Sequence, residues 1–156
     1  MEAMLTRFVY PFALMISLSA IVGCGPSIPE LVPASGRLTI NGDPVPHAKV
    51  SFIPMADGLD GNHTSSGLTD EDGNFSLEIP TGENGAYACL NKITVRDGPA
   101  PAAARSQDPG SAQIWDDFKK SLKNRPIPDD YRSLSGTPLE FTVSGDQAEY
   151  NIEITR

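Results

Sequence analysis

Residues 35–54 read SGRLTINGDPVPHAKVSFIP, and this stretch decides the fold of the chain. Leu38 and Ile40 alternate with polar residues, and an Asn-Gly pair then turns the chain. After the turn, Val50 and Phe52 alternate with polar residues in the same way. Because successive side chains of a strand point to opposite faces, the pattern predicts two strands joined by a turn.

The same alternation recurs further along the chain, in a second hairpin and in three single strands: residues 65–79, 90–96, 139–143 and 150–154. Gly and Pro each contribute 14 of the 156 residues, which favours short strands and turns over a helical bundle. The sequence therefore predicts an all-β fold, a seven-stranded sandwich closed over one core.

One segment departs from this pattern, between the fifth and sixth predicted strands. Residues 97–110 are rich in Pro, Ala, Gly and Asp and are typical of a loop. Residues 111–124 have a helical period, with one apolar face made of Ile114, Trp115, Phe118 and Leu122. We predict one short inserted helix that packs against an open end of the sandwich. The alternative is a helix that presents Trp115 to a partner.

The first residues of the chain are typical of an export signal. Residues 8–23 carry no charge, and this apolar run is shorter than the roughly 20 residues that a membrane-spanning helix needs. The run ends in small residues, as cleaved signal peptides do. Residues 21–24, Ile-Val-Gly-Cys, resemble the lipobox of bacterial lipoproteins. An uncleaved signal anchor and a secreted protein with a chance cysteine are the alternatives.

The lipobox resemblance implies a lipoprotein signal peptide at residues 1–23 and a lipidated Cys24, with a diacylglycerol on its thiol and an acyl chain on its amine. Two or more acyl chains anchor a protein stably. Gly25 after the cysteine resembles lipoproteins of the outer membrane, so we expect a lipid-anchored protein there, in the bacterial cell envelope. Residues 24–34, with three prolines, are predicted to be a tether to a domain spanning 35–156.

Two motifs carry a resemblance to a known domain family, residues 35–54 and the segment 69–75, TDEDGNF. The chain resembles carboxypeptidase regulatory-like domains, which are transthyretin-like (prealbumin-like) sandwiches and include small bacterial lipoproteins of unknown function. The resemblance covers residues 35–156, with 97–125 poorly matched. It implies a prealbumin-like or immunoglobulin-like sandwich and no particular activity, because the motif residues are turn and core residues in that family.

The charge of the chain argues against two classes of partner. Twenty acidic residues against 12 Lys and Arg give a net charge of −8. Nothing in such a chain would neutralise a row of phosphates, so we expect no nucleic acid partner. The same negative net charge argues against binding to anionic lipid headgroups through a polybasic segment.

Few residues suggest chemistry. Cys89 stands where the family usually has Gly and is predicted to be a small, buried or half-buried hydrophobe. His47 and His63 are predicted to be solvated loop residues. The segment from Asp70 opens like a calcium loop, but Thr81 stands where the twelfth position requires Glu. We therefore expect no catalytic residue, no metal site and no cofactor.

One enzymatic relative of the family calls for a separate test. Transthyretin-like hydroxyisourate hydrolases end in Tyr-Arg-Gly-Ser. Here residues 131–133, Tyr-Arg-Ser, are internal and lack the Gly, while the sequence ends in Glu-Ile-Thr-Arg. That activity is not expected.

The expected function is therefore that of a lipid-anchored, non-catalytic envelope protein with a structural, adhesion or assembly role. Its expected partners are the membrane, through Cys24, and an envelope protein or glycan. The alternative is a carbohydrate- or peptide-binding module accessory to an envelope enzyme, in which Trp115 and Tyr131 contact the ligand.

Overall fold

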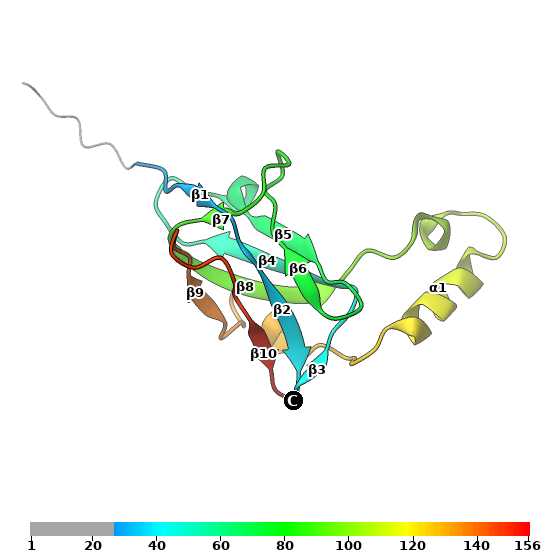
Figure 1. The fold of residues 1–156 in the computed structure, drawn as a ribbon. Helices are drawn as coiled ribbons and strands as arrows, with labels where there is room; N and C mark the ends of the chain where they lie inside the picture. The colour runs from blue at the N-terminus through cyan, green and yellow to red at the C-terminus, as the bar shows by residue number, and fades with distance from the viewer. Residues whose placement is uncertain (1–26) are drawn as a thin grey trace, which may run out of the picture.

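The computed structural model describes residues 27–156, and within them the chain is mostly β-sheet with one α-helix (Figure 1). The strands are β1 (Leu31–Val32), β2 (Ser35–Ile40), β3 (Asp43–Pro44), β4 (Ala48–Pro54), β5 (Ser65–Leu68), β6 (Asn74–Ser76), β7 (Ala86–Tyr87), β8 (Leu90–Asp97), β9 (Glu140–Thr142) and β10 (Ile152–Ile154). The helices are α1 (Ser111–Ser121) and three 3₁₀ turns, η1 (Gly61–His63), η2 (Ala102–Arg105) and η3 (Asp129–Arg132).

Two four-stranded sheets provide most of the architecture. The first has the order β10-β2-β3, with β6 also paired to β2, and the second has the order β5-β4-β8-β9. β10 runs parallel to β2, with Leu38 opposite Ile152, whereas the other strand pairs are antiparallel. The short ribbon β1-β7 completes the fold. This arrangement of two sheets around one core is consistent with a β-sandwich.

The turn between β2 and β3 follows directly from its sequence. Asn41 and Gly42 have φ angles of 52° and 85°. Positive φ at both central residues is the requirement of the tight hairpin turn that Asn-Gly favours. The turn places Ile40 opposite Asp43 and so sets the register of β2 on β3.

The second hairpin turn, before β6, is held by Asp70. Its carboxylate accepts hydrogen bonds from the backbone N–H groups of Asp72 and Asn74, at 2.9 and 2.8 Å. The bond from Asn74 is the main reason that the pKa of Asp70 lies below its usual value. Gly73, with φ of 80°, lies so close to the Leu38 carbonyl that a Cβ would stand 2.5 Å from that oxygen. The acidic segment that resembles the start of a calcium loop is thus a hairpin turn.

The core is an aromatic cluster between the sheets. Phe52 of β4 is fully buried, and its ring centroid lies 6.4 Å from Phe75, 6.1 Å from Phe141 and 5.9 Å from Tyr150. The Tyr150 hydroxyl donates to the carbonyl of Gln147 at 2.8 Å, so the one polar atom of this buried ring is satisfied. Aliphatic side chains of β2, β4, β8 and β10 fill the remaining space: Leu38, Ile40, Val50, Ile93, Val95, Ile152 and Ile154.

The prediction of a mostly-β fold with one inserted helix is confirmed, and each of the seven predicted strand segments contains a strand. The strand count is not seven, because ten strands occur in residues 27–156. The additional strands β1, β3 and β7 have two residues each, which is too short for alternation to be seen in a sequence.

The predicted tether is partly folded. Leu31 and Val32 pair with Tyr87 and Ala86, and Val32 and Ala34 belong to the core. The folded domain therefore begins before residue 35. The prolines at positions 29 and 33 hide the alternation of these buried residues in the sequence.

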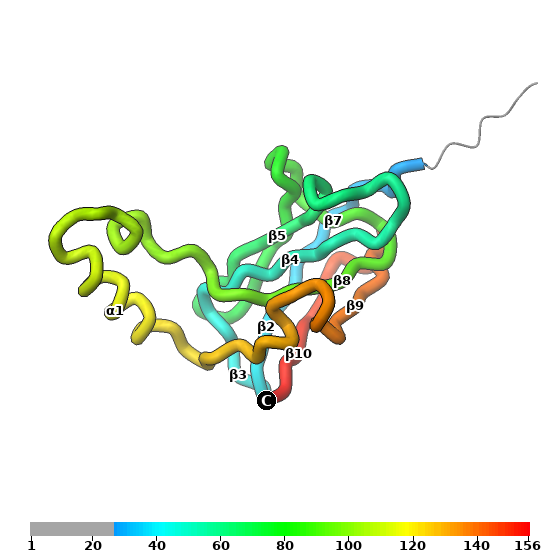
Figure 2. The backbone as a smooth tube through the Cα atoms, turned by 180° about the vertical axis from the view of Figure 1, so that it is seen from behind, coloured from blue at the N-terminus to red at the C-terminus, as the bar shows by residue number. Residues whose placement is uncertain are grey.

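The fold has two distinct ends. The first described residues and β1 lie at one end of the sandwich, and α1 projects from the other end (Figure 1). The reverse view shows the same separation, with the helix and its flanking loops extending well beyond the sheets (Figure 2).

Candidate functional site

Residues 98–124 form a projection between β8 and η3, and we call this segment the arm. It contains η2 and α1, which pack against each other at the tip of the projection (Figure 2). No residue of α1 is buried. The helix ends at Ser121, three residues earlier than predicted, where the Leu122 N–H bonds to the Lys119 carbonyl.

The predicted apolar face of α1 is present and partly exposed. Ile114 is 42% exposed and Trp115 is 41% exposed. The ring of Phe118 is 6.1 Å from the Trp115 ring, and the Lys119 ammonium lies 5.8 Å from the centre of the indole. A cation at this distance from an indole is attracted by the electrons of the ring and helps to fix its orientation.

The expectation that the helix packs against an open end of the sandwich is wrong. The helix meets the sandwich through Phe118, whose ring lies edge-on to His47 with 5.0 Å between ring centres. Among the described helices and strands, the main neighbour of α1 is η2, and no residue of α1 is buried. The alternative, a helix with an exposed Trp115, agrees with the structure.

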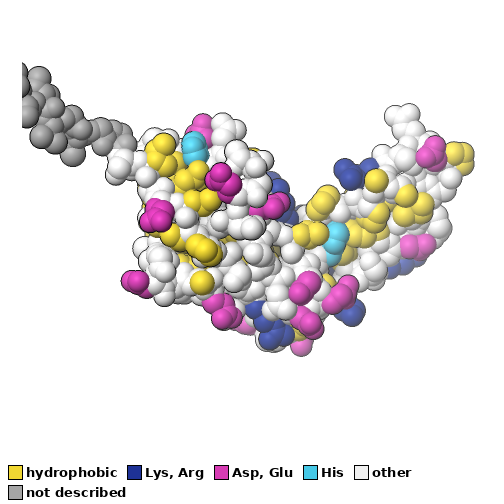
Figure 3. All heavy atoms as spheres, turned by 45° about the horizontal axis from the view of Figure 1, so that its top comes forward, with side chains coloured by type: hydrophobic (Ala, Val, Ile, Leu, Met, Phe, Trp, Pro, Cys, Tyr) yellow, Lys and Arg dark blue, Asp and Glu magenta, His cyan; other side chains and the backbone are white. Residues whose placement is uncertain are grey.

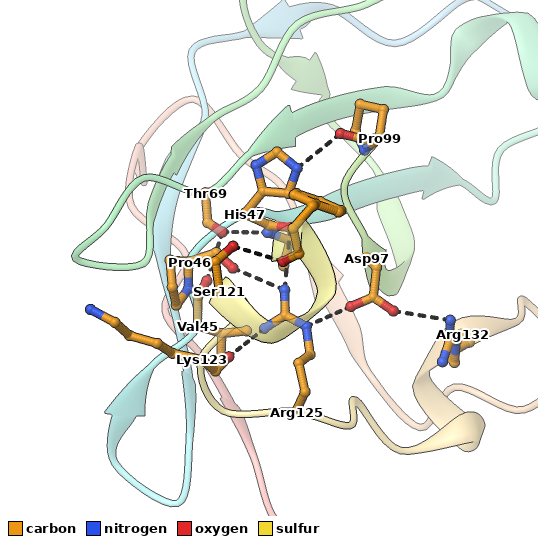
Figure 4. A network of polar contacts seen from close by, with 12 residues as sticks. Val45, Pro46, His47, Thr69, Asp97, Pro99, Ser121, Lys123, Arg125 and Arg132 are labelled. Atoms are coloured by element: carbon orange, nitrogen blue, oxygen red, sulfur yellow. Dashed lines mark hydrogen bonds and ion pairs between the residues drawn. The ribbon is translucent and has the colours of Figure 1, made fainter. Parts of the chain in front are cut away.

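Polar contacts hold the two ends of the arm together where it leaves the sandwich (Figure 4). Arg125, just after the arm, donates through Nε to Asp97 Oδ1 at 2.5 Å. Its Nη2 donates to the carbonyls of Pro46 and His47 at 2.9 and 3.2 Å, and its Nη1 donates to the carbonyl of Lys123 at 2.7 Å. We call this cluster the root of the arm.

Asp97 has a second cationic partner at the root. Arg132 of η3 donates through Nη2 to Asp97 Oδ2 at 3.2 Å, and its carbonyl accepts from Arg96 Nε at 2.6 Å. The Arg125 side chain is only 13% exposed. Hydrogen bonds between charged groups that are partly buried are stronger than those of exposed ion pairs. The root therefore fixes the base of the arm.

His47 belongs to the root and is not a solvated loop residue as predicted. It is half-buried, has φ of 55°, and its Nε2 lies 2.9 Å from the carbonyl oxygen of Pro99. Gly98 donates its N–H to the His47 carbonyl at 2.9 Å. A Cβ at Gly98 would stand 2.8 Å from that carbonyl, so only glycine allows this close approach.

His63 also has a structural role. It is the last residue of η1, and its Nδ1 lies 2.8 Å from an oxygen of Asp60, the residue that caps this turn. The hydrogen bond from the Asn62 N–H, followed by the one with His63, lowers the pKa of Asp60. The His63 ring also meets Tyr87 at 5.5 Å. Within residues 27–156, no group of three or more His, Cys, Asp and Glu side chains is arranged to hold a metal ion.

Cys89 is half-buried, in line with its prediction as a small hydrophobe. Burial is the main factor that raises the pKa of its thiol. The basic residue nearest in sequence, Lys92, forms an ion pair with Glu140 at 3.5 Å. The environment therefore favours the neutral thiol over the reactive thiolate.

The structure does not bring the two predicted ligand-contact residues together. Trp115 is on the arm, whereas Tyr131 lies in η3, is half-buried and packs against the core. Of these two residues, only Trp115 is exposed. The predicted lipidation residue, Cys24, lies outside the described residues, as do the predicted signal peptide and its cleavage site.

Sequence reasoning missed Asp97, Arg125 and Arg132. A signal was present, because the Pro- and Ala-rich insertion has an acidic residue at its start and a basic residue at its end. Opposite charges at the two ends of an insertion are expected to meet if the insertion leaves and rejoins the fold at one place.

No helix among residues 27–156 has both the length and the apolar character needed to cross a membrane. Comparison of the sequence with protein-family models, with curated proteins and with solved structures finds no match.

Proposed function

We propose that this protein is a lipid-anchored, non-catalytic component of the bacterial cell envelope with a structural, adhesion or assembly role. Its anchor is an acylated Cys24 at the outer membrane, and its fold is a prealbumin-like sandwich. The partner is an envelope protein that contacts the arm.

One observation carries this proposal: the N-terminal end of the described chain and the arm lie at opposite ends of the sandwich (Figure 1). A protein held at its N-terminus presents its far end away from the membrane. That far end carries Ile114 and Trp115, two large apolar side chains that are 42% and 41% exposed. Aromatic residues that are exposed in this way are common anchors of protein interfaces.

The polar groups of the described residues also support a non-catalytic role, because they serve the fold. Asp97 and Arg125 fix the root of the arm. Asp60 and His63 cap a 3₁₀ turn, and Asp70 closes a hairpin. Each of these groups makes at least one hydrogen bond that holds a turn or the base of the arm.

Crosslinking in intact cells tests the partner. A photo-crosslinking amino acid at position 115 should trap a defined envelope protein, whereas the same probe at Leu134 should not. Leu134 is the matched control because its exposure, 41%, equals that of Trp115 and it lies outside the arm. Equal products at the two positions, or none at position 115, would contradict the proposal.

Lipid labelling tests the anchor. The Cys24→Ser variant should incorporate no labelled palmitate and should move from the membrane to the soluble fraction, because the acyl chains are the proposed attachment. The Cys89→Ser variant is the control and should be labelled like the unmodified protein. Continued labelling of the Cys24→Ser variant would exclude the anchor.

A second function, a carbohydrate- or peptide-binding module, is favoured by the exposure of Trp115 alone. Trp115 is the single tryptophan of the chain, so its fluorescence reports directly on its surroundings. Titration with glycan and peptide fragments of the cell wall should shift the emission if this module binds them. An unchanged emission with every fragment would argue against the binding module and in favour of the assembly role.

A further inference from the structure

A second group of uncovered apolar side chains lies at the opposite end of the sandwich from the arm. Ile28 is 61% exposed, Met55 is 48% exposed and Leu90 is 44% exposed. We call these three residues the N-terminal patch. The space-filling view shows hydrophobic and acidic side chains intermixed around the N-terminal end of the described chain, and a longer run of hydrophobic side chains along the arm (Figure 3).

Backbone hydrogen bonds bring the segments of the N-terminal patch together. The Met55 N–H donates to the Leu90 carbonyl at 2.9 Å, which joins the end of β4 to the start of β8. The Ala88 N–H donates to the Glu30 carbonyl at 2.8 Å, which places the segment that contains Ile28 beside the residues that lead into β8. The N-terminal patch therefore gathers at one end of the fold three segments that are distant in sequence.

The length of chain before the patch limits how far the patch can be from Cys24. Four peptide units separate Cys24 from Ile28. A chain reaches at most about 3.6 Å per residue, so this separation is at most about 14 Å. If Cys24 carries acyl chains at the membrane surface, as the proposed function requires, the N-terminal patch lies within reach of the headgroups. This inference rests on that proposed anchor.

We propose that the N-terminal patch binds the surface of the phospholipid bilayer in which Cys24 is anchored. Ile28, Met55 and Leu90 insert between the headgroups, and the sandwich is thereby held in one orientation with its arm away from the membrane. Three partly exposed side chains are a small surface for binding from solution. They suffice here because the acyl anchor keeps them at the bilayer, where their effective concentration is high.

The charges near the patch indicate which bilayer surface it fits. Glu30 and Asp57 are exposed beside it, and the nearby Lys92 is paired with Glu140 at 3.5 Å. An acidic rim is repelled by anionic headgroups, so the N-terminal patch is suited to zwitterionic headgroups such as phosphatidylethanolamine.

Fluorescence quenching by brominated lipid tests the proposal with the full-length, lipidated protein in vesicles. The probe is Met55→Trp in a Trp115→Phe background, with Leu90→Trp in the same background as a second probe. The protein with its native Trp115 is the matched control, because its one tryptophan is on the arm. Side chains at the headgroup boundary should lose about half of their emission to shallow bromines, a twofold change, whereas Trp115 should lose none.

The outcomes separate the two proposals. If the lipidated protein does not float with the vesicles, the anchor proposed above fails. If it floats but the Met55→Trp and Leu90→Trp probes are no more quenched than Trp115, the N-terminal patch does not bind the bilayer. Quenching should fall when anionic lipid replaces zwitterionic lipid at low salt, and should recover at high salt. A rise with anionic lipid would overturn the choice of a zwitterionic surface.

Discussion

The sandwich and the arm are built in two different ways. In the sandwich, Phe52 is fully buried between the sheets. In the arm, α1 has no buried residue and depends on η2, on one aromatic contact and on the polar root. The sandwich is thus stabilised by the hydrophobic effect, whereas the arm is positioned by a few polar contacts. A change in one region should therefore have little effect on the stability of the other.

The largest effect is expected from a change in the core. Phe75 is 4% exposed and faces Phe52, so Phe75→Ala should reduce the free energy of unfolding by about 3–5 kcal/mol. Chemical denaturation measures this loss as a lower midpoint. Trp115→Ala on the arm is the matched aromatic control and should leave the midpoint nearly unchanged. Equal effects from the two variants would mean that core and arm form one cooperative unit.

A smaller effect is expected at the boundary between the two regions. Arg125→Ala removes the partner of Asp97 and the bonds to the carbonyls of Pro46, His47 and Lys123. We expect a loss of about 1–3 kcal/mol, the usual range when a charged, partly buried hydrogen-bonding group loses its partner. Limited proteolysis should cut the arm faster in this variant. Lys119→Ala, on the exposed face of α1, should change neither result, and faster cutting there would contradict the role of the root.

Within the sandwich, the buried hydroxyl of Tyr150 should contribute less than a core ring. Tyr150→Phe keeps the aromatic packing but leaves the Gln147 carbonyl and the Ser144 N–H without this partner. A loss of about 1 kcal/mol is expected from the hydrogen bonds alone. Denaturation of the variant measures it, and an unchanged midpoint would show that the hydroxyl is not needed to hold this turn.

The smallest expected effect depends on pH. The pKa of Asp70 is lower in the folded state than in the unfolded chain, mainly through the hydrogen bond from the Asn74 N–H. The stabilisation is therefore complete above the unfolded pKa and is lost as the pH falls through the folded pKa, below about pH 4. Asp70→Asn can still accept these bonds but does not titrate. Its stability should fall less between neutral and acidic pH, and an identical pH profile would exclude this role.

The sequence predicted the strands of the sheets better than the arm, for a physical reason. Leu38, Val50 and Phe75 alternate with polar neighbours because one face of each strand is buried, and that local pattern can be read without the fold. The parallel pairing of β2 with β10 was not predicted, because no local pattern encodes which distant strand becomes a neighbour.

The candidate site was predicted only in part. The apolar face with Trp115 was recognised from its helical period, but that period does not state what covers the face. Tyr131 was expected to contact a ligand, yet its ring packs against the core beside β8. The contacts of Asp97 with Arg125 and Arg132 depend on where the insertion rejoins the sheets, which is a property of the tertiary fold.

The parallel pair β2-β10 has a consequence for the order in which the domain can form. β2 is made of residues 35–40, but the neighbour on one of its edges consists of residues 152–154. A chain that emerges from a ribosome or a translocation channel with its N-terminus first therefore cannot complete this sheet until almost all of the domain has emerged. Until then, the hydrogen-bonding groups along that edge of β2 have no strand to pair with. Pairing between strands so distant in sequence slows folding, because the entropy cost of closing the long intervening loop comes before the contacts that offset it.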